Sequence, residues 1–136
     1  MSHQLSGNCG CGQVKFAIKA AKANVVNCHC NRCRKLNGSS FSTYFVVAEQ
    51  GFEISEGENY LSDYSSSENA RKHFCKQCGT PIYNQNLKYP NLRMVHFGAI
   101  NFLEEVQPNV NIFCESILSW VALNGEIPSF EQEIKK

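Results

Sequence analysis

The sequence has 136 residues, of which 43% are hydrophobic, and its 13 basic and 12 acidic residues leave a formal net charge of +1. This length predicts a single domain, residues 1–136, with enough apolar side chains for a modest core, and it argues against disorder. The near-neutral balance argues against a nucleic-acid partner, and no apolar stretch approaches the roughly 20 residues needed to cross a membrane.

Short alternating, β-branched or aromatic runs predict strands, because Gly, Asn, Ser or Pro bounds each of them. In chain order the predicted strands are 14–18, 41–47, 52–54, 60–64, 81–84 and 94–100. Residues 31–36 favour one or two helical turns that end at Asn37-Gly38, and 111–123 fit either an irregular arm or a short helix. The sequence therefore predicts a mainly β chain with little helix.

The eight cysteines are the main chemical signal. The amino terminus has no charged start and apolar run of a secretory signal, so we expect a cytoplasmic protein. In a reducing compartment the thiols favour metal binding over disulfides. We therefore expect zinc rather than disulfide bonds.

Seven cysteines stand in four short clusters: Cys9 with Cys11, Cys28 with Cys30, Cys33, and Cys75 with Cys78. A Cys-x-x-Cys turn, or a Cys-x-Cys pair in an extended chain, brings two sulfurs together as tetrahedral zinc requires. Dividing the seven clustered thiols between two metal ions favours one closed site with four ligands, from the pairs 9/11 and 75/78. The other three thiols then form an open site with three ligands. The alternative is that the three also close, with Cys114, His29, His73 or His96 as the fourth ligand.

Three blocks of sequence resemble the glutathione-dependent formaldehyde-activating enzyme family, whose relatives include centromere protein V. The first runs from Gly7-Asn-Cys9 to Phe16, the second is Cys28-His-Cys30-Asn-Arg-Cys33, and the third runs from Arg71 to Ile82 around Cys75 and Cys78. A weaker block runs from Pro108 to Trp120, so the resemblance covers residues 7–120.

The resemblance implies a β-tent-like zinc-binding domain of short antiparallel sheets. It implies two zinc ions per chain, a structural one on Cys9, Cys11, Cys75 and Cys78, and a catalytic one on Cys28, Cys30 and Cys33. The implied activity is that of a carbon–sulfur lyase, the formation or breakdown of S-(hydroxymethyl)glutathione from glutathione and formaldehyde. The alternative function is a non-catalytic zinc-stabilised binding or structural module.

Three thiolates leave the metal a weak Lewis acid, which favours a small thiol such as glutathione as the substrate. Arg32, Arg34 and Lys35 either pair with the carboxylates of that thiol or form a solvated face. The sequence departs from the family pattern at Asn111, where relatives usually carry His, and at Ile117, where Lys is common.

Four further residues are expected to have structural roles. His29 is predicted to point away from its two flanking ligands, because alternate residues of an extended chain face opposite ways. Cys114 is predicted to be a buried apolar thiol. Phe113 and Trp120 are predicted to lie in the core.

Overall fold

The computed structural model describes residues 3–134, which form two compact units, each built from two separate chain segments. Unit 1 comprises Met1–Ala23 and Phe45–Glu105, and unit 2 comprises Asn24–Tyr44 and Val106–Lys136. The prediction of one domain spanning residues 1–136 stays a prediction. No helix among residues 3–134 is long and apolar enough to cross a membrane.

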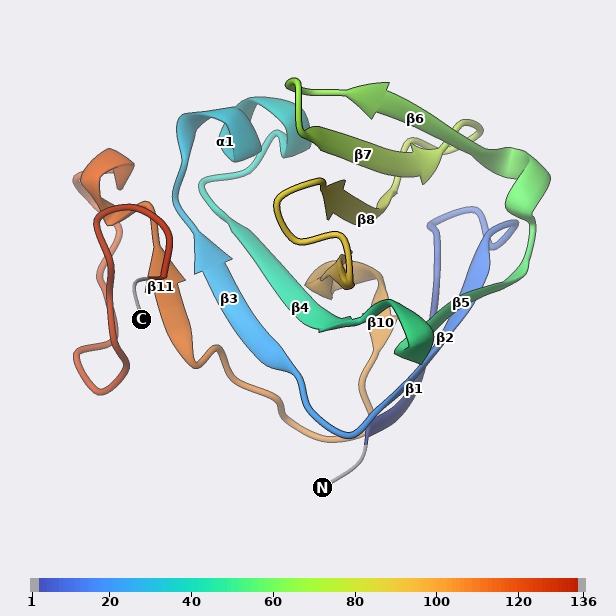
Figure 1. The fold of residues 1–136 in the computed structure, drawn as a ribbon, viewed down its shortest axis with the longest axis horizontal. Coiled ribbons are helices and arrows are strands. Elements are labelled where there is room, and N and C mark those ends of the chain that lie inside the picture. The colour runs from blue at the N-terminus through green and yellow to red at the C-terminus, as the bar shows by residue number, and fades with distance from the viewer. Residues whose placement is uncertain (1–2, 135–136) are drawn as a thin grey trace. The chain divides into compact units, whose positions relative to one another are not determined.

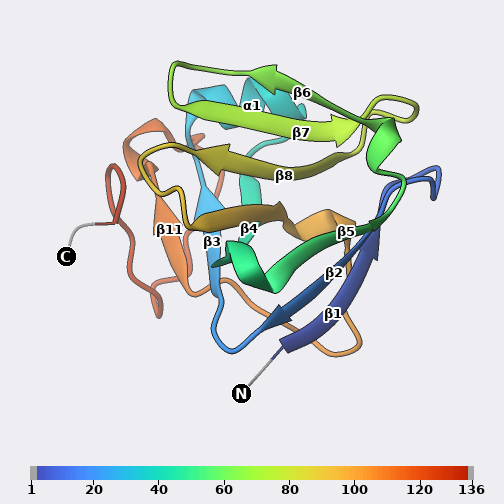
Figure 2. The same cartoon turned by 45° about the vertical axis from the view of Figure 1, so that its right-hand side comes forward.

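Unit 1 contains a four-stranded antiparallel sheet with the order β10-β1-β2-β5. Figures 1 and 2 both show β1, β2 and β5 side by side. The strands are β1 (His3–Asn8), β2 (Lys15–Ala20), β5 (Phe52–Glu56) and β10 (Ile100–Asn101). Strand β2 alternates exposed and buried residues, which places Phe16 and Ile18 in the core of the unit.

Four more strands of unit 1 pair in the order β6-β7-β8-β9, with antiparallel neighbours, as Figure 2 shows. They are β6 (Leu61–Ser65), β7 (Ala70–Cys75), β8 (Pro81–Asn86) and β9 (Leu92–His96). Ile82 and Val95 are fully buried in this layer. Short 3-10 helices connect the strands at Glu49–Gly51, Glu58–Tyr60 and Phe97–Ala99.

Gly57 shows why the turn before β6 requires glycine. Its φ of +78° lies in the left-handed region, and a Cβ built there would overlap the backbone carbonyl of Gln13. The turn therefore packs directly on the backbone that follows Cys11.

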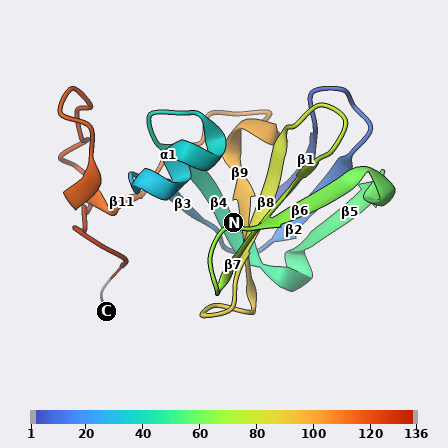
Figure 3. The same cartoon turned by 90° about the horizontal axis from the view of Figure 1, so that it is seen from above.

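Unit 2 is built around β3 (Asn24–Cys28), which has β11 (Val110–Ile112) on one side and the start of β4 (Ser42–Ala48) on the other. Strand β11 runs parallel to β3 and pairs Asn111 with Asn27 and Ile112 with Cys28. Helix α1 (Asn31–Asn37) follows β3, as Figure 3 shows, and ends at Gly38 in the left-handed conformation. A 3-10 helix, Cys114–Ser116, follows β11.

The prediction of a mainly β chain of short antiparallel sheets with little helix is confirmed, with β3 and β11 as a parallel exception. The predicted helix is α1, and the six predicted strands correspond to β2, β4, β5, β6, β8 and β9. The run 94–100 is interrupted, because residues 97–99 form a 3-10 turn. Strands β1, β3 and β7 were not predicted, and the ambiguous segment 111–123 begins in a strand.

Candidate metal centres

The first cysteine cluster lies in unit 1, where the turn after β1 meets the turn after β7. The sulfurs of Cys9, Cys11, Cys75 and Cys78 all lie within 4.8 Å of one another. The Cys9 and Cys11 sulfurs are 3.6 Å apart, and those of Cys11 and Cys75 are 3.8 Å apart. Zn–S bonds of ~2.3 Å at tetrahedral angles place sulfurs about 3.8 Å apart, so this group fits zinc.

Local hydrogen bonds prepare these sulfurs for a metal. The Val14 amide donates to Cys9 Sγ at 3.2 Å. The Thr80 hydroxyl lies 3.2 Å from Cys78 Sγ and accepts a 2.9 Å hydrogen bond from the Gly10 amide. The Thr80 hydroxyl lowers the pKa of Cys78 to about 5, which favours the thiolate that binds zinc.

The second cluster lies in unit 2, where β3 leads into α1. Cys28 ends β3, Cys30 is the N-cap of α1, and Cys33 lies in its first turn. Their sulfurs lie within 4.8 Å of one another, and the Cys28 and Cys33 sulfurs are 3.6 Å apart. That spacing also fits tetrahedral zinc.

Cys30 is the most acidic thiol of this group. The Cys28 and Cys33 side chains hydrogen-bond to it and hold its pKa far below the ordinary value, while the same contact raises the pKa of Cys28. The Cys33 amide also donates to Cys30 Sγ at 3.2 Å. One sulfur is therefore ready as an anion, and a cation would favour ionisation of the other two.

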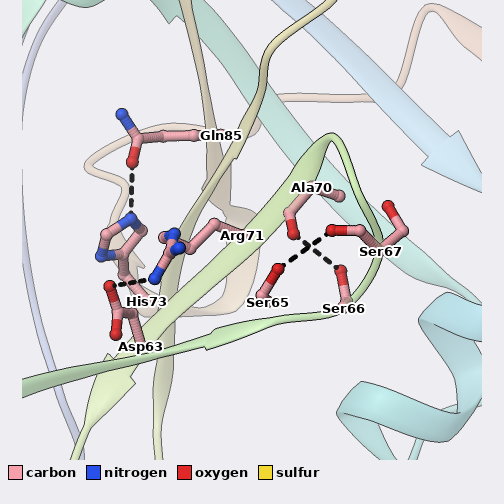
Figure 4. Close-up of polar contacts among 8 residues, drawn as sticks. All are labelled: Asp63, Ser65, Ser66, Ser67, Ala70, Arg71, His73 and Gln85. Carbon is pink, nitrogen blue, oxygen red and sulfur yellow. Dashed lines mark hydrogen bonds and ion pairs between the residues drawn. The ribbon is translucent and has the colours of Figure 1, made fainter.

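No fourth His, Cys, Asp or Glu among the described residues joins this group of three. His73 instead lies 2.6 Å from Gln85 Oε1 and stacks on Tyr83, and Figure 4 shows the contact with Gln85. His96 lies 2.9 Å from Asn84 Oδ1, and Cys114 is half-buried outside the group. The structure thus gives no support to a triplet closed by any of the four alternative ligands.

Tyr44 on β4 is a neighbour of the triplet that sequence reasoning missed. Its buried hydroxyl lies 3.2 Å from Cys33 Sγ. Burial raises the pKa of Tyr44 far above its ordinary value, so the phenol keeps its proton and can donate it in a hydrogen bond to a thiolate. A lone tyrosine in a strand carries no motif, and only the pairing of strands brings it to the cysteines.

Arg34 has a structural role that limits its availability to a ligand. Its guanidinium donates to the backbone carbonyls of His29, at 2.7 Å, and Ser116, at 2.8 Å. These two hydrogen bonds tie the cysteine loop, residues 28–33, to the segment after β11. Arg32 and Lys35 lie exposed on α1.

His29 is buried, and it lines a cavity with Asn111 instead of joining the cysteines, as the alternation of the chain predicted. Burial lowers the pKa of His29, and the nearby Asn111 amide partly opposes that shift. Asn111 is itself 2% exposed, accepts from the Asn27 amide and donates to the Ser129 hydroxyl. Asn111, where the sequence departs from the family pattern, is thus a packed residue of strand β11.

Three predictions about packing need correction. Trp120 was expected in the core, but its side chain is 71% exposed, in a stretch (117–128) that contains neither helix nor strand. Cys114 is half-buried rather than fully buried, although burial still raises its pKa. Phe113, also expected in the core, is only half-buried and takes a left-handed backbone conformation, with φ of 55°. Ile117 is also half-buried.

Residues 4–116 match the family model described as glutathione-dependent formaldehyde-activating enzyme. A Halomonas elongata protein named "Putative glutathione-dependent formaldehyde-activating enzyme" is 26% identical over 95% of this chain and 84% of its own length. A Phaeosphaeria nodorum protein of the same name is 22% identical over 95% of this chain and 70% of its own length.

A Schizosaccharomyces pombe protein named an uncharacterized lyase is 32% identical over 59% of this chain, and the match spans only 56% of that protein. A crystal structure of a Rhodobacter sphaeroides protein superposes with a TM-score of 0.62 at 22% identity. It covers 91% of this chain and 98% of the Rhodobacter chain. At that identity the match shows a shared fold.

Proposed function

Because this chain belongs to the glutathione-dependent formaldehyde-activating enzyme family, we propose that it is a carbon–sulfur lyase acting on an adduct of a small thiol and an aldehyde. The finer proposal is the formation or breakdown of S-(hydroxymethyl)glutathione. In the forward direction a C–S bond forms between the glutathione sulfur and the formaldehyde carbon, and the thiol proton ends on the formaldehyde oxygen. The names of the Halomonas and Schizosaccharomyces relatives support this class of reaction.

The observation that carries the proposal is the group of three cysteines that no further His, Cys, Asp or Glu of the described chain joins. A purely structural zinc site uses four protein ligands, whereas a catalytic site keeps one position for substrate or water. We propose that Cys28, Cys30 and Cys33 hold a catalytic zinc and that Cys9, Cys11, Cys75 and Cys78 hold a structural one. Zinc on three thiolates supplies a position that favours a soft sulfur ligand over an activated water.

The chain's own residues have distinct parts in this scheme. The Tyr44 hydroxyl lies 3.2 Å from Cys33 Sγ and would donate to that sulfur, and so orient it, once a metal has made Cys33 a thiolate. Arg34 holds the cysteine loop in place through two backbone carbonyls. Arg32 and Lys35 are exposed and free to meet the carboxylates of a peptide thiol, and guanidinium–carboxylate pairing suits Arg32 in particular.

Exchange NMR tests the reaction directly. Zinc-loaded protein is mixed with glutathione and formaldehyde, and the exchange between formaldehyde and its glutathione adduct is measured with and without protein. We expect faster exchange with the wild-type chain and the uncatalysed rate with Cys30→Ser. Wild-type exchange at the uncatalysed rate would refute the formaldehyde activity and favour the non-catalytic zinc module.

Calorimetry separates binding from catalysis. Reduced glutathione should bind the zinc-loaded protein more tightly than S-methylglutathione, because the methylated sulfur cannot become a thiolate. Equal affinities for the two ligands would remove sulfur–metal contact from the proposal.

A further inference from the structure

Unit 2 contains a cavity of about 220 Å³ beside His29. Its wall includes His29, Phe41 and parts of the later segment that contains Gln107, Val121 and Ile127. None of the three cysteines lines it, although His29 lies between two of them in the sequence. The cavity is therefore a feature separate from the proposed catalytic centre.

His29 is the unexplained group in this cavity. Its side chain is 1% exposed, and neither ring nitrogen makes a well-formed hydrogen bond within residues 3–134. The Asn111 side chain lies near enough to influence the pKa of His29, but its amide is already bonded to Asn27 and Ser129. The ring is held against Phe41, with centroids 5.0 Å apart. Nearly all buried polar groups in proteins are paired, so an orphaned imidazole that faces a cavity indicates that the cavity occupant supplies the partner.

The remaining lining defines the chemistry of that occupant. No Asp, Glu, Lys or Arg is present among the lining residues, so a charged molecule would lose its hydration without gaining a counter-charge. The polar lining consists of His29 and side-chain amides, and apolar side chains form the rest of the wall. The amides are those of Asn27, Gln107, Asn111 and Asn124.

A neutral imidazole offers one donor and one acceptor, and a side-chain amide offers both. The complementary ligand has an acceptor and a donor of its own and a short aliphatic part. We propose that this cavity binds a small uncharged molecule with a carboxamide group, which hydrogen-bonds to His29. This site goes beyond the proposed lyase function and does not depend on it.

Ordered water is the competing occupant, because water could also satisfy both ring nitrogens. The volume of about 220 Å³ would require several waters, at about 30 Å³ each, against a wall that is partly apolar. Val121, Leu123 and Ile127 offer those waters no hydrogen bond. The apolar part of the wall favours an aliphatic group over water.

The test uses isobutyramide and isobutyrate as probes, which share a skeleton and differ in charge. Each is titrated into zinc-loaded, nitrogen-15-labelled full-length protein while the histidine ring nitrogens are followed by NMR. We expect a saturable shift at His29 with isobutyramide and an affinity at least about tenfold weaker for isobutyrate, whose charge must be desolvated. Equal affinities for the two probes would overturn the proposal. So would ring-nitrogen signals of His29 that show hydrogen bonds to water alone.

Two variants locate the binding. His29→Phe keeps an aromatic ring without nitrogens, and Val121→Trp fills the cavity from another lining position. Both should abolish the isobutyramide shift measured by protein resonances around Phe41. His73→Phe is the matched control, because that histidine already has Gln85 as its partner, and it should bind like the wild type. Retained binding in a folded His29→Phe or Val121→Trp protein would show that the cavity is not the site. If His29→Phe does not fold, the Val121→Trp result and the wild-type His29 shift decide.

Discussion

Tyr44→Phe tests whether the tyrosine orients the triplet, because it removes one buried oxygen and leaves the ring. The hydroxyl lies 3.2 Å from Cys33 Sγ in a site that is 6% exposed, so water cannot easily replace it. A hydrogen bond to a charged acceptor contributes about 1.5–3 kcal/mol. Loss of a hydrogen bond to a metal ligand typically lowers metal affinity 10–100-fold, which agrees with that range.

The assay is a competition titration of zinc between the protein and a chromophoric chelator, in which the four-cysteine site acts as an internal reference. We expect the weaker of the two zinc affinities to fall 10–100-fold in Tyr44→Phe while the tighter one is unchanged. Tyr64→Phe is the matched control, since that ring is 57% exposed in unit 1. An affinity within twofold of wild type would refute the role assigned to the hydroxyl.

Four further predictions concern the metals and the packing. Elemental analysis of protein purified without chelator should give close to two zinc per chain, and a reproducible value of zero would end the zinc interpretation. Cys75→Ser should yield insoluble or unfolded protein, because structural zinc contributes about 10–16 kcal/mol in small zinc-folded domains. Cys30→Ser should instead give a folded protein with one metal. Circular dichroism that shows both variants unfolded would contradict the division into a structural and a catalytic site. Asn111→His should lower the melting temperature, because a larger ring replaces a buried amide that makes two side-chain hydrogen bonds. An unchanged melting temperature would show that the site adapts to the ring. Gly57→Ala should destabilise the protein by about 3 kcal/mol in a denaturant titration, because it adds left-handed strain and an overlap with backbone atoms. Gly38→Ala adds the strain alone and should cost about 1–2 kcal/mol. Equal losses in the two variants would exclude the overlap.

The sequence predicted the cysteine groups because their geometry is mostly local. Cys28, Cys30 and Cys33 lie within six positions, so no error in the predicted topology could separate them. The pairs 9/11 and 75/78 are distant in the chain, and their meeting followed from counting ligands and is seen in the structure. The need of zinc for four ligands thus predicted a contact between distant parts of the chain that strand propensity did not predict.

Features that depend on tertiary contacts were missed. Strand β7 contains Arg71, Lys72 and His73 and looks polar, yet pairing with β6 and β8 makes it a strand. Tyr44 has no local signal that distinguishes it from other strand tyrosines. Trp120 was placed in the core because large apolar rings are usually buried, but the segment around it has no regular partner.

The division of unit 2 into two distant segments has a consequence for synthesis on the ribosome. The thiols of Cys28, Cys30 and Cys33 emerge roughly 80 residues before β11, whose Ile112 carbonyl accepts from the His29 amide. At translation rates of about 5–20 residues per second, the cysteine loop lacks that strand for about 4–16 seconds. During that interval the nascent thiols are accessible to oxidants and to competing metals, whereas the four cysteines of unit 1 can close as soon as Cys78 has emerged. The chain order thus completes the four-cysteine group before the strand that packs on the three-cysteine loop has emerged.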